Sequence, residues 1–223
     1  SFSYSDNTNS ASAYVEAGVT NQKHPENSST THFLNRFWTL SATNLTDYTA
    51  NVEFTYNVAD IVGDALKIYC GQYNGTTWEL HEQVAGYSLS AYGITSFGDF
   101  TGGESYAFTD AMSGDYYIDW NTGASPDYFS FNEAVNDLIL RGVSGAVTFY
   151  VAEGTYDEQV TIPAIYGASF SNTIIFQAQT GASVELTSNA TTPDGNWIVN
   201  FDGADYVTFK DMTISNNLPD PFG

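Results

Sequence analysis

The chain has 223 residues, 42% of them hydrophobic and 16% aromatic, which is enough for one large or two ordinary globular domains. Its 26 Asp and Glu residues against 5 Lys and Arg residues give a formal charge of -21 at pH 7, which repels nucleic-acid phosphates and excludes nucleic acid as a partner. The single cysteine, Cys70, excludes an internal disulfide framework, and no apolar run approaches the roughly 20 residues that span a bilayer, so we expect no membrane insertion.

Alternating polar and apolar residues predict short strands through the first half of the chain. In the run NVEFTYNV, residues 51–58, one face is shared by Val52, Phe54, Tyr56 and Val58, which predicts a half-buried strand. Two alternating runs flank Asn74-Gly75, and Asn-Gly between such runs is a strong hairpin signal. Further runs occur at 11–19, 33–42, 93–97 and 105–109. This spacing predicts an immunoglobulin-like β-sandwich over residues 1–110.

One amphipathic helix is predicted after a connection at residues 111–128. Ser130 and Glu133 have the spacing of a capping box, and Arg141 suits the C-terminal end of the helix dipole. Gly142 can end the helix in a left-handed conformation. An apolar stripe at helical spacing is formed by Ala134, Val135, Leu138 and Ile139. We therefore expect a helix over residues 129–142.

Beyond the helix, alternating apolar runs recur at a nearly constant interval. One series comprises residues 147–151, 174–178 and 197–201, and a second comprises 160–162, 184–186 and 207–209. The second series starts at Val160, Val184 and Val207, with intervals of 24 and 23 positions that fit successive coils of a parallel β-solenoid. We expect residues 143–223 to form the first coils of a parallel β-helix, with the helix as a lid on its open end. The alternative is a second sandwich with evenly spaced hairpins.

Several segments resemble a known family. The helix and the segments RGVSGAVTFYVAEGTYDEQVTIPAI, NTIIFQAQTGASVEL and NFDGADYVTFKDMTISNN resemble the start of the right-handed parallel β-helix (pectin-lyase-like) region of large secreted surface proteins of Bacteroidota, including gliding-type adhesins exported by the type IX system. The segment SFGDFTGGESYAF is similar to the end of their sandwich modules. The resemblance implies an all-β chain, a β-sandwich followed by a helix-capped, truncated right-handed parallel β-helix, at an extracellular or cell-surface location.

The resemblance carries over no catalytic residue. Its polysaccharide-cleaving members place catalytic carboxylates and basic residues on later coils than the three visible here. The chain stops at NLPDPFG without a C-terminal cap or a type IX sorting domain, and we expect a fragment. The open solenoid end would then be covered by the remainder of the same large protein or by a capping partner.

Exposed aromatic rings beside amides and carboxylates can bind carbohydrate without chemistry. The candidates are Tyr73, beside the Asn-Gly turn, and Tyr116, Tyr117 and Trp120 in the connection. Packing between domains explains the three aromatic residues of the connection equally well. The partner that these residues would bind is a surface polysaccharide or glycan.

Paired carboxylates are the candidates for metal binding. Asp202 and Asp205, in FDGADY, lie at a predicted coil corner where Gly203 permits a tight turn, and Ca²⁺ would be the metal that suits such oxygen ligands. Asp115 and Asp119 form a weaker pair. The competing interpretation is that Asp at such a corner hydrogen-bonds its own backbone and ends the strand.

The histidines give weak catalytic signals. The sequence HEQVA begins at His81 but lacks the second histidine of a zinc-protease motif, and we interpret His81 as an exposed strand residue. His24 and His32 could form a two-histidine site, but no patterned carboxylate lies nearby in the sequence. GYSLS, at residues 86–90, lacks the last glycine of a nucleophile elbow.

The leading hypothesis is therefore a non-catalytic extracellular module of a large cell-surface protein, used for adhesion, display or carbohydrate contact. One alternative is the N-terminal part of a polysaccharide lyase or hydrolase whose catalytic coils are absent from this chain. Another alternative is a calcium-stabilised structural spacer.

Overall fold

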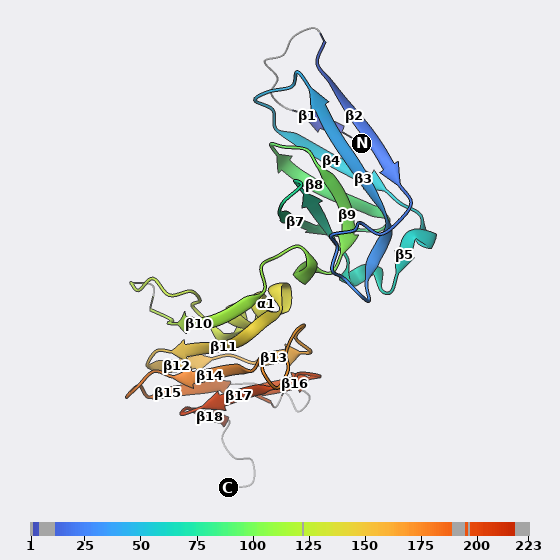
Figure 1. The fold of residues 1–223 in the computed structure, drawn as a ribbon. Helices are drawn as coiled ribbons and strands as arrows, with labels where there is room; N and C mark the ends of the chain where they lie inside the picture. Colours follow the sequence, from blue (N-terminus) through green and yellow to red (C-terminus); the bar gives the residue numbers. More distant parts are fainter. Residues whose placement is uncertain (1, 5–11, 122, 189–194, 196, 217–223) are drawn as a thin grey trace. The chain divides into compact units, whose positions relative to one another are not determined.

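The computed structural model describes residues 2–4, 12–121, 123–188, 195 and 197–216 (Figure 1). The chain is mostly β, as predicted, with one short α-helix. It divides into two compact units, Ser1–Thr109 and Asp110–Gly223, which are called unit 1 and unit 2 below. Within the described residues, no helix has both the length and the apolar character needed to cross a membrane.

Unit 1 is built from two antiparallel sheets. The first has the order β1 (Phe2–Tyr4), β4 (Ala50–Thr55), β8 (Ser88–Ile94). The second has the order β2 (Tyr14–Thr20), β3 (Phe33–Thr43), β9 (Asp99–Gly103), β6 (Tyr69–Tyr73), β7 (Trp78–Gln83), and β5 (Ile61–Val62) pairs with β3 at the side. Three 3-10 turns, Val58–Asp60, Ala65–Lys67 and Ser105–Ala107, join the strands.

One apolar core takes side chains from both sheets of unit 1. Val52 and Leu89 come from the first sheet, while Leu34, Cys70 and Phe100 come from the second. Because side chains alternate along a strand, the run at 51–58 buries Val52 and exposes its neighbours. Val58, predicted on the same face as Val52, is 62% exposed because β4 ends at Thr55 and Val58 begins a 3-10 turn. Burial raises the pKa of the Cys70 thiol, which makes Cys70 an inert core residue.

The predicted Asn-Gly hairpin is confirmed. Strands β6 and β7 pair antiparallel, with Tyr73 opposite Trp78. The Asn74 side-chain oxygen accepts hydrogen bonds from the backbone N–H groups of Thr76 and Thr77, and Gly75 has a φ of 97°. A glycine is favoured there because an L side chain is strained at positive φ.

Unit 2 consists of three parallel sheets and the helix. The four-stranded sheet has the order β10 (Met112–Ile118), β11 (Val143–Val151), β14 (Ile174–Ala178), β17 (Val207–Lys210). The three-stranded sheet has the order β12 (Gly154–Asp157), β15 (Val184–Ser188), β18 (Thr213–Asn216). The two-stranded sheet joins β13 (Val160–Pro163) to β16 (Val199–Asp202), and α1 spans Phe131–Arg141.

The strand pairing corrects the predicted interval of the repeat. Val147, Ile174 and Val207 lie in register, at intervals of 27 and then 33 positions. Val160 pairs with Val199, and Val184 pairs with Gly154, so the series with intervals of 24 and 23 combined strands from three different sheets. All strand pairs among the described residues of unit 2 are parallel, and the alternative of evenly spaced hairpins is therefore wrong.

The interior of unit 2 contains a column of stacked rings. Tyr116, Phe149, Phe176 and Phe209 occupy matching positions on β10, β11, β14 and β17, and they are called the inner ladder below. The Phe149 and Phe176 ring centroids are 4.7 Å apart with an interplanar angle of 13°, and those of Phe176 and Phe209 are 5.0 Å apart at 14°. Parallel pairing places identical side chains above one another, which is why the rings stack.

Helix α1 forms where the capping signals predict it. The Ser130 hydroxyl accepts a hydrogen bond from the Glu133 N–H, and Glu133 accepts one from the Phe129 N–H. Gly142 ends the helix with a φ of 64°. Three side chains of the predicted apolar stripe, Ala134, Val135 and Leu138, enter the core of unit 2 together with Phe131. Ile139, predicted to join this stripe, is 45% exposed.

Candidate functional site

The outer face of the four-stranded sheet in unit 2 carries a row of aromatic and polar side chains. Tyr117, Tyr150, Gln177 and Lys210 occupy one register line across β10, β11, β14 and β17, and they are called the outer row below. The Tyr117 and Tyr150 rings stack with centroids 5.7 Å apart and an interplanar angle of 29°. Tyr117 is 49% exposed, so the stack presents an accessible ring next to hydrogen-bonding groups.

Asp211 fixes the polar end of the outer row. The Gln177 amide nitrogen donates to the Asp211 carboxylate at 3.3 Å, and the Lys210 ammonium lies 3.8 Å from the same oxygen. Lys210 and Asp211 are both largely exposed, so this pair contributes little to stability. The arrangement therefore offers donors and acceptors to a ligand that stacks on the tyrosines.

The neighbouring tyrosines of β10 lie on opposite faces of the sheet. Tyr117 belongs to the outer row, whereas Tyr116 is the first member of the inner ladder, with its ring 5.7 Å from that of Phe149. Tyr116 is half-buried against the core of unit 2. The period of two along a strand separates these two candidate residues, and only Tyr117 reaches the outer face.

Trp120 lies beyond the end of β10, and its ring packs against the backbone at Glu153 and Gly154. Its indole Nε1 donates to the Glu153 carbonyl oxygen at 3.0 Å. A Cβ atom on Gly154 would lie 2.2 Å from that nitrogen, so the close approach requires glycine. The Trp120 side chain is 57% exposed, which leaves it accessible although its position is fixed.

Tyr73 belongs to an aromatic cluster of unit 1. Its ring lies 4.9 Å from Trp78 and 5.4 Å from His24, measured between ring centroids. His24 is 4% exposed and also contacts Phe37 edge to face at 4.9 Å. Tyr73 is therefore half-buried, and its ring packs on the segment that carries His24.

Both ring nitrogens of His24 are engaged. The Glu26 N–H donates to Nδ1 at 3.2 Å, so Nδ1 is an acceptor and Nε2 carries the proton that it donates to Asp99 at 3.1 Å. Thr39 donates to the other Asp99 oxygen at 2.5 Å. An imidazole with both nitrogens hydrogen-bonded cannot act as a general base without breaking one of these bonds. The hydrogen bonds among His24, Asp99 and Thr39 instead hold the loop between β2 and β3, which carries His24, against the second sheet.

The other two histidines are also held by protein groups. His32 Nδ1 accepts from the Asp64 N–H at 2.8 Å, and His24 and His32 have separate partners. His81 Nε2 lies 3.0 Å from the amide oxygen of Gln72, which is 3% exposed. The prediction of an exposed His81 is wrong, because the ring is half-buried on this buried amide. Burial lowers the pKa of His81, although the charges of Glu79 and Glu82 oppose the shift.

The predicted carboxylate pair lies on the surface of unit 2. Asp202 is the last residue of β16, Asp205 lies two positions after Gly203, and both aspartates are exposed. Gly203 has a φ of 87°, in agreement with a tight turn. Across the described part of the chain, no three His, Cys, Asp or Glu side chains converge closely enough to hold a metal ion.

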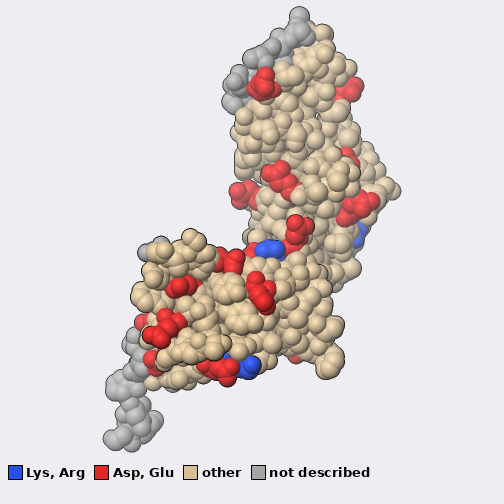
Figure 2. Space-filling view, turned by 60° about the vertical axis from the view of Figure 1, so that its left-hand side comes forward, with Lys and Arg blue, Asp and Glu red and all other residues tan. Residues whose placement is uncertain are grey.

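Acidic side chains are spread over the visible surface of each unit. Figure 2 shows Asp and Glu residues at many separate points, with few Lys and Arg residues among them. A single acidic patch is not seen on this face. On this face, the acidic residues are therefore distributed and do not form one binding patch.

The outer row includes three residues that sequence reasoning missed. In the sequence, Tyr150 and Gln177 belong to apolar runs and Lys210 directly follows one, so none of the three stands out as a binding residue. Aligning the runs at 147–151 and 174–178 position by position would have placed Tyr150 beside Gln177. Tyr117 and Lys210 could be added only with the pairing partners of β10 and β17, which the structure supplies.

Comparison with models of protein families, with curated proteins and with solved structures found no match to this chain.

Proposed function

We propose that the chain is a non-catalytic module of a large extracellular surface protein, in which a β-sandwich precedes the first coils of a right-handed parallel β-helix. On this proposal, unit 2 is the rigid element and its outer row binds a glycan. The observation that carries the proposal is the alignment of Tyr117, Tyr150, Gln177 and Lys210 on one register line, with Tyr117 and Lys210 exposed and Tyr150 and Gln177 half-buried.

The packing of unit 2 supports the solenoid part of the proposal. From β11 onward, successive segments of the chain each add one strand to the four-stranded sheet and one to the three-stranded sheet, as the coils of a solenoid do. The inner positions of the last strands are less covered than those before them. Phe201 is 51% exposed whereas its partner Ile162 is fully buried, and Ile214 is 45% exposed whereas Leu186 is fully buried. The remainder of a larger protein, or a capping partner, would cover these side chains.

The outer row supports glycan contact. A tyrosine face accepts the apolar side of a sugar ring, while the amide and the ammonium can hydrogen-bond hydroxyl groups. The net charge of -21 disfavours strongly anionic polysaccharides, so neutral glycans are the expected class. Calcium would bind on this proposal only as an exchangeable counterion of an acidic surface.

The chemistry of the described side chains favours binding over catalysis. The three histidines are all hydrogen-bonded to protein groups, and the single thiol is buried. A glycoside hydrolase needs two carboxyl groups on either side of a substrate bond. Asp202 and Asp205, the candidate pair, lie at one turn and are both exposed to solvent.

The test is binding of neutral polysaccharides such as mannan, xylan and β-glucan, measured by affinity electrophoresis and titration calorimetry. Tyr117→Ala/Tyr150→Ala should weaken binding at least about tenfold, which corresponds to about 1.4 kcal/mol. The matched control is Tyr14→Ala/Tyr92→Ala, because these tyrosines are exposed on unit 1. Equal binding by both variants, or no binding of any glycan, would overturn glycan contact. Release of oligosaccharides from these polymers would overturn the non-catalytic assignment.

A further inference from the structure

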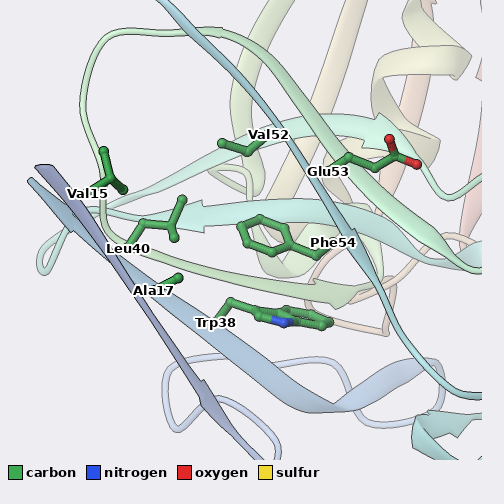
Figure 3. A pocket seen from close by; sticks show the side chains of 7 residues that line it. All are labelled: Val15, Ala17, Trp38, Leu40, Val52, Glu53 and Phe54. Carbon is green, nitrogen blue, oxygen red and sulfur yellow. The ribbon is translucent and has the colours of Figure 1, made fainter. Parts of the chain in front are cut away.

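Two features of unit 1 lie apart from the outer row, an apolar cavity and the turn between β6 and β7. The cavity has a volume of about 370 Å³ and lies among side chains of β2, β3 and β4 (Figure 3). Figure 3 shows the Glu53 carboxylate directed away from the other six side chains of the lining, which are apolar. The lining residues are Val15, Ala17, Trp38, Leu40, Val52, Glu53 and Phe54. An apolar lining alone identifies no ligand, whereas the turn carries defined chemistry.

The turn contains Asn74-Gly75, the only Asn-Gly pair in the sequence. Residues 74–77 are all exposed to water. The Cγ atom of an asparagine side chain can be attacked by the backbone nitrogen of the following residue, and a glycine there has no side chain to hinder the attack. Among the described residues, no atom lies within 4 Å of the position that a Cβ atom on Gly75 would take. The surroundings of Gly75 therefore leave room for this reaction.

The reaction needs only water as a co-reactant. The Gly75 nitrogen loses its proton to water and forms a bond to Asn74 Cγ, while the bond from Cγ to the side-chain nitrogen breaks and that nitrogen leaves with a proton as ammonia. The product is a five-membered succinimide ring. Water then opens the ring at one of its two carbonyl carbons. Opening at Cγ gives aspartate, whereas opening at the backbone carbonyl gives isoaspartate, whose main chain is one carbon longer.

The folded turn holds the Asn74 side chain in hydrogen bonds to residues beyond Gly75. The Asn74 Oδ1 atom accepts from the N–H groups of Thr76 and Thr77, both at 2.9 Å. The Nδ2 atom donates to Thr77 Oγ1 at 3.0 Å, and the Asn74 backbone N–H donates to the Thr77 carbonyl oxygen at 3.1 Å. The side chain must rotate out of its three bonds before Cγ can bond to the Gly75 nitrogen, so the turn has to open locally first.

The turn is connected to the loop between β2 and β3. Tyr73 pairs with Trp78 across the hairpin. The Trp78 indole Nε1 donates to the Glu26 carbonyl oxygen at 3.2 Å, and the Trp78 ring lies 5.0 Å from the His24 ring, measured between centroids. An extra main-chain carbon at Asn74 would lie between Tyr73 and Trp78 and would shift their register. Trp78 would then lose its position over this loop.

We propose that Asn74 is a modification site, at which opening of the turn permits succinimide formation and the isoaspartate product releases the loop between β2 and β3 from Trp78. The intact hairpin slows the reaction relative to an unfolded chain. The aspartate product leaves the turn closed, because its carboxylate still accepts from the Thr76 and Thr77 N–H groups. Glycan binding by unit 2 plays no part in this reaction.

The first test compares the full chain with the end-blocked peptide Gln-Tyr-Asn-Gly-Thr-Thr-Trp, which has the sequence of residues 72–78. Conversion of Asn74 is followed at mildly alkaline pH by mass spectrometry of digests. We expect Asn74 to react at least about tenfold more slowly in the native chain than in the peptide, because opening the turn breaks several hydrogen bonds. In concentrated urea the two rates should agree.

Each comparison has an outcome that would overturn part of the proposal. Equal rates in the native chain and the peptide would show that the turn does not control the reaction. An unmodified Asn74 in urea would overturn the modification site itself. Asn44 is an exposed asparagine followed by Leu45, and it should stay unmodified while Asn74 reacts. Equal conversion of Asn44 would overturn the role of Gly75.

Two threonine variants test the hydrogen bonds of the turn. Thr77→Val removes the hydroxyl that accepts from Asn74 Nδ2, and it should raise the rate in the native chain at least about twofold. Thr76→Val is the matched control, because Thr76 is also exposed and bonds to Asn74 through its backbone N–H, which the variant keeps. Equal rates in the two variants would overturn the protection by the Asn74 side-chain bonds.

The effect of isoaspartate on the loop is tested on separated products. Ion exchange isolates chains with the added negative charge, and isoaspartyl methyltransferase identifies the isoaspartate form. The indole N–H of Trp78 should exchange with solvent faster in this form than in the unmodified chain. Asn74→Asp adds the same charge without the extra carbon and should leave this exchange unchanged. The same exchange rate in the isoaspartate form and in Asn74→Asp would overturn the release of the loop.

Discussion

The carboxylate of Glu158 accepts two hydrogen bonds from Asn132, one from its backbone N–H at 3.0 Å and one from its side-chain amide at 2.7 Å. The other carboxylate oxygen accepts from the Phe131 N–H at 3.0 Å. Glu158 follows β12, so a residue from the strands caps the N-terminus of α1, where a negative charge also suits the helix dipole.

Glu158→Ala should destabilise unit 2 by about 1–2 kcal/mol, because two N–H groups at the start of α1 lose their acceptor. The free energy of unfolding can be measured by urea denaturation followed by far-UV circular dichroism. Glu153→Ala is the control, since Glu153 is exposed and its substitution removes the same charge. Equal destabilisation by the two variants would show that the loss of charge, and not the cap, matters.

Phe176→Ala should destabilise unit 2 by about 3–5 kcal/mol, since Phe176 is fully buried in the middle of the inner ladder and its removal leaves a cavity. Thermal and urea unfolding measure the change. Phe170→Ala provides the comparison, because Phe170 is 90% exposed and its removal should change stability by less than about 0.5 kcal/mol. A loss below 1 kcal/mol for Phe176→Ala would contradict the described packing.

Cys70 should react with a thiol reagent only when unit 1 opens, because its side chain is fully buried and burial raises the pKa of the thiol. An opening that costs about 3 kcal/mol slows labelling roughly 100-fold relative to a free thiol. In a Thr76→Cys variant, the added thiol on the exposed hairpin turn should react at once and Cys70 slowly. Two equally fast thiols would contradict the burial of Cys70.

The contribution of Asp60 to the stability of unit 1 should be lost in acid. Burial opposes ionisation of this carboxyl, but hydrogen bonds from Arg36 and from the Asn57 N–H, with attraction to Arg36, outweigh it and lower the pKa of Asp60 below 3.8. A carboxyl whose pKa is lower in the folded state stabilises the fold above its unfolded value, and this stabilisation is lost as the pH falls through the folded value.

The melting temperature of Asp60→Asn should therefore lie furthest below that of the unchanged chain at about pH 6, and the two should converge below about pH 3. Glu16→Gln, an exposed carboxylate of the same unit, should give no such pH-dependent difference. A difference between Asp60→Asn and the unchanged chain that stays constant over this range would exclude the Arg36–Asp60 pair as its origin.

The helix and the hairpin could be predicted from the sequence because their signals are local. Ser130, Glu133 and Gly142 act within a few residues of the helix ends, and Asn74 bonds to Thr76 and Thr77, two and three residues further on. The candidate site was predicted less well. Tyr117 and Trp120 are exposed as expected, whereas Tyr116 turned inward and Tyr150 was missed, since strand pairing decides which aromatic rings align.

The sequence by itself determined which residues could be inside, because a period of two in strands and of about 3.6 in the helix sorts side chains into faces before any distant contact forms. It also determined the all-β class and the ends of α1. Only the tertiary structure decided which strands pair. The intervals of 27 and 33 positions depend on loops of unequal length, and a regular spacing of apolar runs cannot distinguish strands of one sheet from strands of three. The cap that Glu158 provides to α1 was likewise decided by the tertiary structure, because Glu158 and Asn132 are 26 positions apart and meet only in the folded unit.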